Sequence, residues 1–337
     1  MKIFRKIQTE CTLNQREKFA DFLALNSEKS FLEKTNYLDN ISENEKGNYN
    51  EIRNSGYFKP SDNGKSLIFS YADDVLDYFK NASGYDSHVP IYANNRVKYS
   101  KNGDKTNSGY ISFDTGTVLN CPQIRETLLE ISKNKSIAAY LKCRPRLYSC
   151  NTFWTFPKNE KLLTHSWHRD LDDFKFLSVF IFWTDTNEEN GYIKFIEGSH
   201  NHLNHKSLLS SSKSIWLSKS KNNNYINFPS EKLRDKFYRI NKEVPNGYGF
   251  DSLYERIFWN NIVKLYGPPG TYIICDTFGL HSGSSVIKPR LVTWFRFGLY
   301  ENLAWHYDKN VVSKKDLNLI EKYNSTIKDI DFSLITP

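Results

Sequence analysis

The chain has 337 residues, of which 39% are hydrophobic and 15% aromatic, so it can bury one sizeable core and is not a disordered segment. Its formal net charge is +8, but the lysines and arginines are scattered, which gives little support to nucleic-acid binding. The five cysteines form no C-x-x-C pair and are odd in number, which argues against a disulfide framework and favours reduced thiols.

No segment has the pattern of a targeting signal or a membrane span. The first ten residues contain no apolar core of a signal peptide, and no later run approaches the roughly 18 apolar residues that a span requires. We therefore expect a cytoplasmic protein with no membrane partner, folded as a single domain over residues 1–337.

Residues 1–140 mix helical patterns with polar stretches. Amphipathic spacing predicts helices over Asn14–Leu25, Tyr71–Asn81 and Pro122–Lys133. The stretches Ser42–Ser55 and Lys101–Ser108 are polar and rich in Gly or Asn, so we expect them to be irregular. This zone is predicted to act as helical or irregular support and as a lid.

Residues 141–300 read as strands separated by turns. The run Phe176–Trp183 is apolar throughout and has the length of a strand, and after a polar turn the run Tyr192–Ile196 follows. Further strand patterns, separated by Gly and Pro turns, cover Asn261–Tyr266, Thr271–Cys275 and Arg290–Phe297. With an insertion over 201–260, they predict a mainly β fold with flanking α-helices, a jelly-roll barrel. The extension 301–337 contains a predicted closing helix, Lys314–Ile327.

Two histidines and one aspartate form a candidate iron site. On a strand, His168 and Asp170 project to the same face while Arg169 points away, and His281 is the candidate third ligand. Two imidazoles and one carboxylate leave three positions of an octahedral ion open, as in non-heme Fe(II) oxygenases. A lone H-x-D motif is weak evidence, since a surface turn or a core histidine also produces it, but the flanking strand patterns favour the metal.

At these residues the chain resembles the phytanoyl-CoA dioxygenase family of Fe(II)/2-oxoglutarate oxygenases. The resemblance rests on Trp167–Asp170, on Trp183-Thr184 followed by Asn190–His200, and on His281–Ser284 with Arg290 downstream. It extends over about residues 145–300. Where the family usually has a proline before Gly-Ser-His, this chain has Glu197.

The resemblance implies a double-stranded β-helix with His168, Asp170 and His281 as iron ligands. It further implies that Arg290 binds the distal carboxylate of 2-oxoglutarate and that Trp183 lines the cosubstrate pocket. The implied cofactors are Fe(II), 2-oxoglutarate and O2, with ascorbate as an optional reductant. The implied activity is hydroxylation of an unactivated C–H bond of a small molecule, with release of succinate and CO2.

A second arginine competes for the carboxylate. Arg290 and Arg296 share one face of a strand, and either planar guanidinium could offer two parallel N–H groups to a carboxylate. Arg290 matches the family position. Arg296 lies six residues farther along, roughly 20 Å at the rise of a strand, and is expected to form a structural ion pair.

Several alternatives stay open at this point. The same oxidant can also produce desaturation or ring formation, and a non-catalytic metal-binding barrel or a zinc or manganese cupin enzyme would use similar ligands. Asp170 favours hydroxylation over halogenation, because related halogenases lack this carboxylate. Lysines in the insertion form a solvated loop or draw an acidic substrate towards the barrel; they are Lys206, Lys213, Lys219 and Lys221.

The remaining histidines are expected to serve structural or surface roles. His165 lies three residues before His168 and so on the opposite face of a strand, where it would contact a ligand or solvent rather than the metal. The others have polar surroundings or follow a turn: His200, His202, His205 and His306. The His-Arg-Asp triplet also occurs in kinase catalytic loops, but Lys175 stands where such a loop requires Asn.

Overall fold

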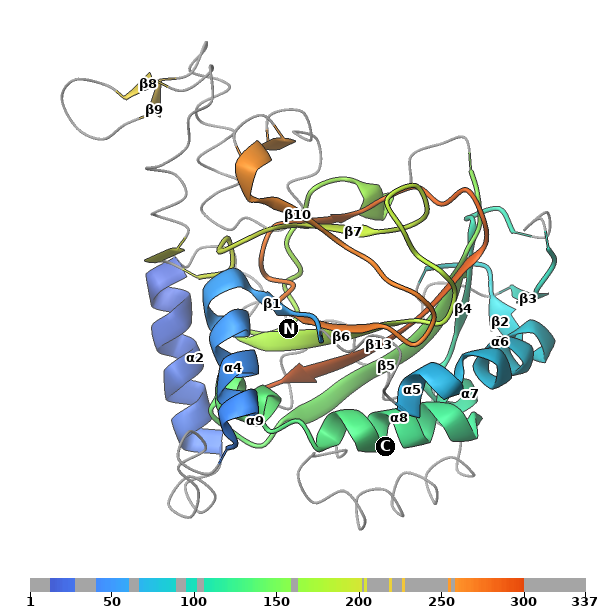
Figure 1. Ribbon diagram of the computed structural model, residues 1–337, viewed down its shortest axis with the longest axis horizontal. Helices are drawn as coiled ribbons and strands as arrows, with labels where there is room; N and C mark the ends of the chain where they lie inside the picture. Colours follow the sequence, from blue (N-terminus) through green and yellow to red (C-terminus); the bar gives the residue numbers. More distant parts are fainter. Residues whose placement is uncertain are drawn as a thin grey trace.

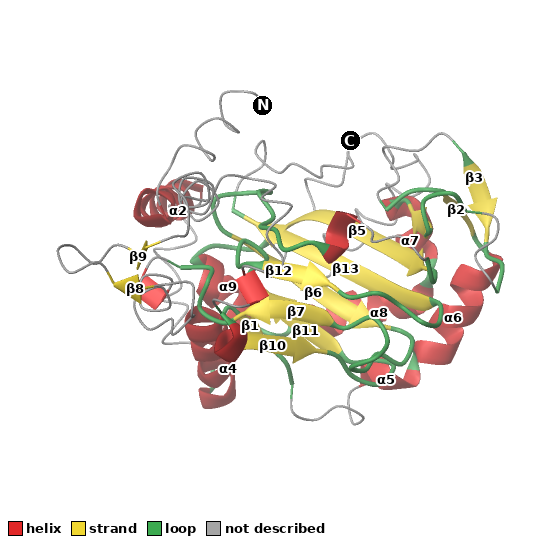
Figure 2. Ribbon diagram, turned by 90° about the horizontal axis from the view of Figure 1, so that it is seen from above, coloured by secondary structure: helices red, strands yellow, loops and turns green. Residues whose placement is uncertain are grey.

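The computed structural model describes residues 13–27, 41–60, 67–88, 95–101, 106–158, 163–201, 203–204, 218–219, 226–227, 254–255 and 258–299. Two antiparallel sheets with helices around the larger one make up this part of the chain (Figure 1, Figure 2). The expected mainly β fold with flanking helices is therefore confirmed. No hydrogen bonds join the two sheets among the described strands, so the double-stranded β-helix is an open sandwich rather than a closed barrel.

The larger sheet has eight strands in the order β1-β11-β6-β13-β5-β4-β2-β3, and the smaller has three in the order β10-β7-β12. The strands of the larger sheet are β1 (Tyr57–Phe58), β2 (Ser83–Tyr85), β3 (Arg96–Lys98), β4 (Tyr110–Phe113), β5 (Arg146–Thr155), β6 (Phe176–Phe182), β11 (Tyr272–Cys275) and β13 (Arg290–Gly298). Those of the smaller are β7 (Ile193–Ile196), β10 (Ile262–Leu265) and β12 (His281–Gly283). A separate pair consists of β8 (Ser218–Lys219) and β9 (Ile226–Asn227).

The helices are α2 (Leu13–Ser27), α4 (Glu43–Ser55), α5 (Leu67–Ser70), α6 (Ala72–Asn81), α7 (Thr115–Asn120), α8 (Pro122–Ser132) and α9 (Ser136–Leu141), with 3-10 turns η2 (Leu163–His165) and η3 (Trp259–Asn261). The three helices predicted from amphipathic spacing correspond to α2, α6 and α8, and are confirmed. Figure 1 shows α8 running along the larger sheet, while α2, α4 and α9 gather at one end of it. No described helix combines the length and apolar character needed to cross a membrane.

The central strands β6 and β13 of the larger sheet are buried on both faces. On β6, Val179 and Ile181 join the core on the helix side, whereas Phe180 and Phe182 join a second core between the two sheets. Phe182 of β6 lies opposite Val292 of β13, and Phe180 lies opposite Trp294. The side chains of the two strands therefore alternate between the same two faces of the sheet. Burial on two faces explains why the strand pattern in the sequence is a continuous apolar run rather than an alternating one.

The expectation that Ser42–Ser55 is irregular is wrong, because residues 43–55 form α4. Ser42 Oγ accepts a hydrogen bond from the backbone N–H of Glu45 at 3.3 Å, and Glu45 Oε2 accepts one from the backbone N–H of Ser42 at 2.9 Å. This capping box satisfies two N–H groups at the start of the helix, and Gly56 ends it with a φ of 91°. The S-x-x-E signal outweighed the Gly and Asn content.

Ser42→Ala should lower the free energy of unfolding by about 0.5–2 kcal/mol, because the helix loses the acceptor for its N-terminal N–H group. Urea denaturation followed by circular dichroism measures the change. Ser42→Thr keeps a hydroxyl acceptor and should lose much less. Equal stability of the alanine variant and the wild type would contradict the role of the cap.

The expectation that residues 1–140 only support and cover the barrel is incomplete. Strand β4 pairs with β5 along Tyr110–Phe113, and β1 pairs with β11 at the other edge of the larger sheet. The sheet therefore begins well before residue 141. The predicted helix Lys314–Ile327 and most of the insertion 201–260 lie outside the described residues.

The described cysteines agree with the expectation of reduced thiols. Four are buried and form no disulfide bond with one another: Cys121, Cys143, Cys150 and Cys275. Cys11 lies outside the described residues. Burial raises the pKa of Cys275, so this thiol stays protonated at neutral pH.

Candidate metal centre

The backbone holds the three predicted ligands side by side. His168 lies in an extended segment before β6 and exchanges two backbone hydrogen bonds with His281, the first residue of β12, at 2.9 and 3.0 Å. The N–H of Asp170 donates to the carbonyl of Thr277 at 2.9 Å. Segments more than 100 residues apart in the chain are thus joined next to the site.

The side chains of His168, Asp170 and His281 converge. Asp170 Oδ1 lies 3.7 Å from His168 Nε2, and Asp170 Oδ2 lies 3.7 Å from His281 Nε2. One donor atom from each residue lies within 4.8 Å of the other two. Ligands that bind one ion at about 2.1 Å lie roughly 3–4 Å from each other, so small side-chain movements would close the site on a metal.

Hydrogen bonds orient the two imidazoles. His168 Nδ1 donates to the carbonyl of Ser166 at 2.7 Å, and His281 Nδ1 donates to the carbonyl of Gly279 at 2.9 Å. A carbonyl can only accept, so Nδ1 carries the proton and the lone pair of Nε2 faces Asp170. Burial and the neighbouring His168 lower the pKa of His281 to about 4, which keeps it neutral at pH 7. Neutral imidazoles and one carboxylate are the donors that suit Fe(II).

Arg169 points away from this cluster, as the alternation of a strand predicts. Its Nη1 donates to the carbonyls of Ser199 at 2.7 Å and Phe278 at 2.6 Å. It therefore ties the His168–Asp170 segment to the Gly-Ser-His turn and to the turn before His281.

Arg290 is a buried cation that has no anionic partner among the residues the structure describes. Its side chain lies on β13 opposite Thr155, donates to the carbonyl of Gly191 and reaches Thr155 Oγ1 at 3.5 Å. Among the described residues, no carboxylate lies within 4.0 Å of the guanidinium, and Nε has no hydrogen-bond partner. Burial lowers the pKa of Arg290 to about 10. Such a group is costly to bury unless an anion arrives to pair with it.

A close approach explains the glycine beside Arg290. Gly191 has a φ of 73°, and a Cβ at this position would lie 2.7 Å from Cδ of Arg290. The arginine stem occupies the space that any other residue would need. The Asn190-Gly191 turn thus helps to shape the position of the guanidinium.

Arg296, in contrast, already binds two carboxylates. It donates to Asp172 Oδ2, and its Nη2 lies 3.3 Å from Asp170 Oδ2. Burial alone would lower its pKa, but the charges of Asp172 and Asp170 outweigh burial and raise the pKa above the usual value. This agrees with the predicted ion pair and leaves Arg290 as the arginine able to receive a further carboxylate.

Trp183 lies on the helix-covered face of the larger sheet, opposite to the face that carries Arg290. Its ring is fully buried in the helix-side core, and its Nε1 donates to Thr293 Oγ1 at 2.8 Å. Arg290, Val292 and Trp294 alternate with Thr293 along β13 and face the space between the sheets. The position of Trp183 therefore does not support the expectation that it lines a cosubstrate pocket. Successive side chains of an extended segment point to opposite faces, and that of Trp183 points away from the space between the sheets.

Other residues line the space between Arg290 and Arg296. Trp294 Nε1 and Asn151 Oδ1 are buried there, and neither has a hydrogen-bond partner within the described part of the chain. The ring of His88 packs against Tyr110 and Phe153, both at 4.8 Å, and against Trp294 at 5.1 Å between ring centroids. The alternation of β13 could have pointed to Trp294, but no sequence signal pointed to His88 or Asn151.

The other described histidines are structural. His165 is buried, and its carbonyl accepts a hydrogen bond from Ser282 Oγ at 2.9 Å. His200 is also buried, with Nε2 lying 3.1 Å from the carbonyl of Arg53, and burial lowers its pKa. A surface role is therefore wrong for His165 and His200, whereas the burial of both agrees with a structural role. His202, His205 and His306 lie outside the described residues.

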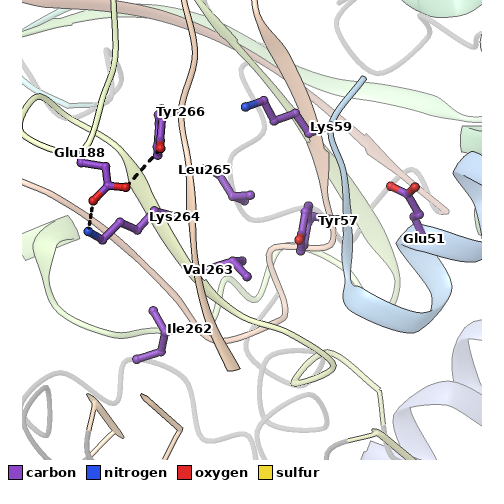
Figure 3. A pocket seen from close by; sticks show the side chains of 9 residues that line it. All are labelled: Glu51, Tyr57, Lys59, Glu188, Ile262, Val263, Lys264, Leu265 and Tyr266. Atoms are coloured by element: carbon purple, nitrogen blue, oxygen red, sulfur yellow. Dashed lines mark hydrogen bonds and ion pairs between the residues drawn. The ribbon is translucent and has the colours of Figure 1, made fainter. Parts of the chain in front are cut away.

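Two open cavities lie away from the candidate metal centre. One, of about 590 Å³, runs between β1 and the edge strand β10, where Glu188 binds Lys264 at 2.6 Å and Tyr266 at 3.2 Å (Figure 3). The other, of about 460 Å³, is lined by α2, α4 and residues including Lys175 and Asp276. None of the predicted site residues lines either cavity.

No protein-family model and no curated protein matches the chain. Solved structures similar to it include the non-heme alpha-ketoglutarate-dependent epimerase SnoN from nogalamycin biosynthesis, with 14% identity, a TM-score of 0.44, and coverage of 76% of this chain and 83% of that chain. EctD from S. alaskensis, solved with 2-oxoglutarate and 5-hydroxyectoine, shows 14% identity, a TM-score of 0.44, and coverage of 77% and 76%. The alpha-ketoglutarate-dependent carbocyclase SnoK, also from nogalamycin biosynthesis, shows 14% identity, a TM-score of 0.42, and coverage of 77% and 84%. The resemblance to phytanoyl-CoA dioxygenases in particular stays a prediction.

Proposed function

We propose that the protein is an Fe(II)- and 2-oxoglutarate-dependent oxygenase that hydroxylates a C–H bond of a small molecule. The observation that carries the proposal is the pairing of two features of the described residues. His168, Asp170 and His281 converge, and the buried guanidinium of Arg290 lacks an anion. A dicarboxylic keto acid needs both a metal with open positions and a distal cation.

In this proposal, His168, Asp170 and His281 hold Fe(II), and Arg290 pairs with the distal carboxylate of the keto acid. The bound iron supplies activation of O2, with one oxygen atom entering the product and the other entering succinate as CO2 leaves. The overall reaction is R–H plus 2-oxoglutarate plus O2, giving R–OH plus succinate plus CO2. The apolar core between the sheets, which includes Phe153 and Trp294, would limit access of water to the reacting groups.

The test is succinate formation from 2-oxoglutarate by protein loaded with Fe(II), in the presence of O2 and ascorbate. A screen of small molecules, acidic ones included, identifies the substrate as the compound that stimulates turnover. Metal binding without binding of 2-oxoglutarate would contradict the proposal and support the non-catalytic barrel instead. Products with one new double bond or ring would replace hydroxylation by desaturation or cyclisation.

We expect the product mass to rise by one oxygen even in excess chloride. With Asp170 as a ligand, its carboxylate would take the coordination position that a halide needs, so chloride would not reach the iron at that place. Mass spectrometry of the product, with and without chloride, measures this. A chlorinated main product would show that Asp170 is not a ligand.

A further inference from the structure

A chain of buried polar groups lies behind Asp170. Arg296 reaches Asp170 Oδ2 at 3.3 Å and also donates to Asp172 Oδ2, which accepts a hydrogen bond from Tyr148 Oη at 2.8 Å. Arg296, Asp172 and Tyr148 are 2%, 1% and 0% exposed, respectively. Because these groups are shielded from water, solvent cannot replace their contacts, and their hydrogen bonds to one another fix the positions of the side chains.

The strands are shaped to make these contacts. On β5, Ser149 lies opposite Arg296 and Leu147 lies opposite Phe297, so Tyr148 is the extra residue of a β-bulge. A bulge re-aims a side chain, and here Tyr148 leaves the helix-side core that contains Leu147 and turns towards Asp172. The guanidinium of Arg296 also lies 4.2 Å from the ring of Trp294. The two carboxylates and the Trp294 ring together fix the position of the Arg296 guanidinium.

We propose that Arg296 is a positioning residue, which holds Oδ2 of Asp170 so that this carboxylate offers the metal only Oδ1. Asp172 and Tyr148 in turn hold the guanidinium. This inference rests on the proposed function and goes beyond it, because it assigns to Arg296 a role in keeping coordination positions open. A carboxylate bound through both oxygens would take one of the three positions that a keto acid and O2 need.

Three variants test the inference. The double variant Arg296→Met with Asp172→Asn removes the hold on Asp170 while preserving the charge balance of the pair. Arg296→Lys keeps the charge but cannot hold two carboxylates with a planar fork. Tyr148→Phe removes one hydroxyl and little else. The matched control is Arg96→Met, which breaks an arginine–carboxylate pair with Asp114 whose arginine side chain is 50% exposed.

The readout is calorimetric binding under anaerobic conditions, first of Fe(II), then of 2-oxoglutarate or pyruvate to the iron-loaded protein. Pyruvate has the same keto-acid end as 2-oxoglutarate but no distal carboxylate, so it reports on the metal positions alone. A purely structural role would change thermal stability without changing the pyruvate affinity of the folded protein. The two keto acids thus separate Arg296 from Arg290.

We expect the double variant still to bind one Fe(II), while its affinities for both keto acids fall by about ten-fold or more. Arg296→Lys should show an intermediate loss, and Tyr148→Phe a loss of roughly two- to ten-fold. Arg96→Met should match the wild type. If the double variant does not fold, Tyr148→Phe carries the test. Wild-type pyruvate affinity in the folded Arg296 and Tyr148 variants would overturn the inference alone, whereas a wild type that binds no Fe(II) or 2-oxoglutarate would overturn the proposed function.

Discussion

Asp170→Asn should abolish succinate formation and weaken Fe(II) binding by at least about 100-fold, more than the loss usually seen when a group next to a metal ligand is removed. The amide keeps the shape of the side chain and can still accept a hydrogen bond from Arg296, but it loses the negative charge that binds the cation. Anaerobic calorimetry measures the iron affinity, and the succinate assay measures turnover.

Folding should change little in this variant, because Arg296 keeps its partner Asp172. Thermal unfolding followed by circular dichroism checks this point. Asp185→Asn is the matched control: Asp185 lies exposed in the turn before β7, and its substitution should leave iron binding and turnover unchanged. Turnover of Asp170→Asn at the wild-type rate would remove Asp170 from the site.

Arg290→Met should raise the dissociation constant for 2-oxoglutarate by roughly 30-fold or more. Truncation of one partner of a buried charge pair costs about 2–5 kcal/mol, and each 1.4 kcal/mol or so corresponds to a factor of about ten. Iron and pyruvate affinities should stay at the wild-type level, since the arginine meets the end of the acid remote from the metal. Calorimetry with the two keto acids measures the difference.

The ligand-free Arg290→Met variant should be at least as stable as the wild type, because it removes a buried cation that has no anion among the described residues. Urea denaturation of the iron-free protein measures this. Equal 2-oxoglutarate affinities of variant and wild type would show that another group binds the distal carboxylate. In that case Arg290 would have no role in the proposed site.

Local pattern was sufficient for part of this protein. Strand β6 follows from its continuous apolar run, and α2, α6 and α8 follow from amphipathic spacing, because neighbours along the chain decide both. The grouping of His168 with Asp170 also follows from local geometry, since residues two apart on an extended segment share a face. The capping box of α4 was equally local, and the prediction missed it by giving weight to Gly and Asn content.

Tertiary structure decided what depends on partners far apart in the chain. The difference between Arg290 and Arg296 follows from Asp170 and Asp172, which lie more than 120 residues away from Arg296 along the chain and pair with its guanidinium. The face of Trp183 depends on which side of the larger sheet the helices cover, and alternation alone cannot tell the two sides apart. The addition of β4 to β5 depends on hydrogen bonds between segments that share no sequence pattern. Sequence periodicity describes one strand or helix at a time, whereas charge pairing and sheet order are properties of the assembled chain.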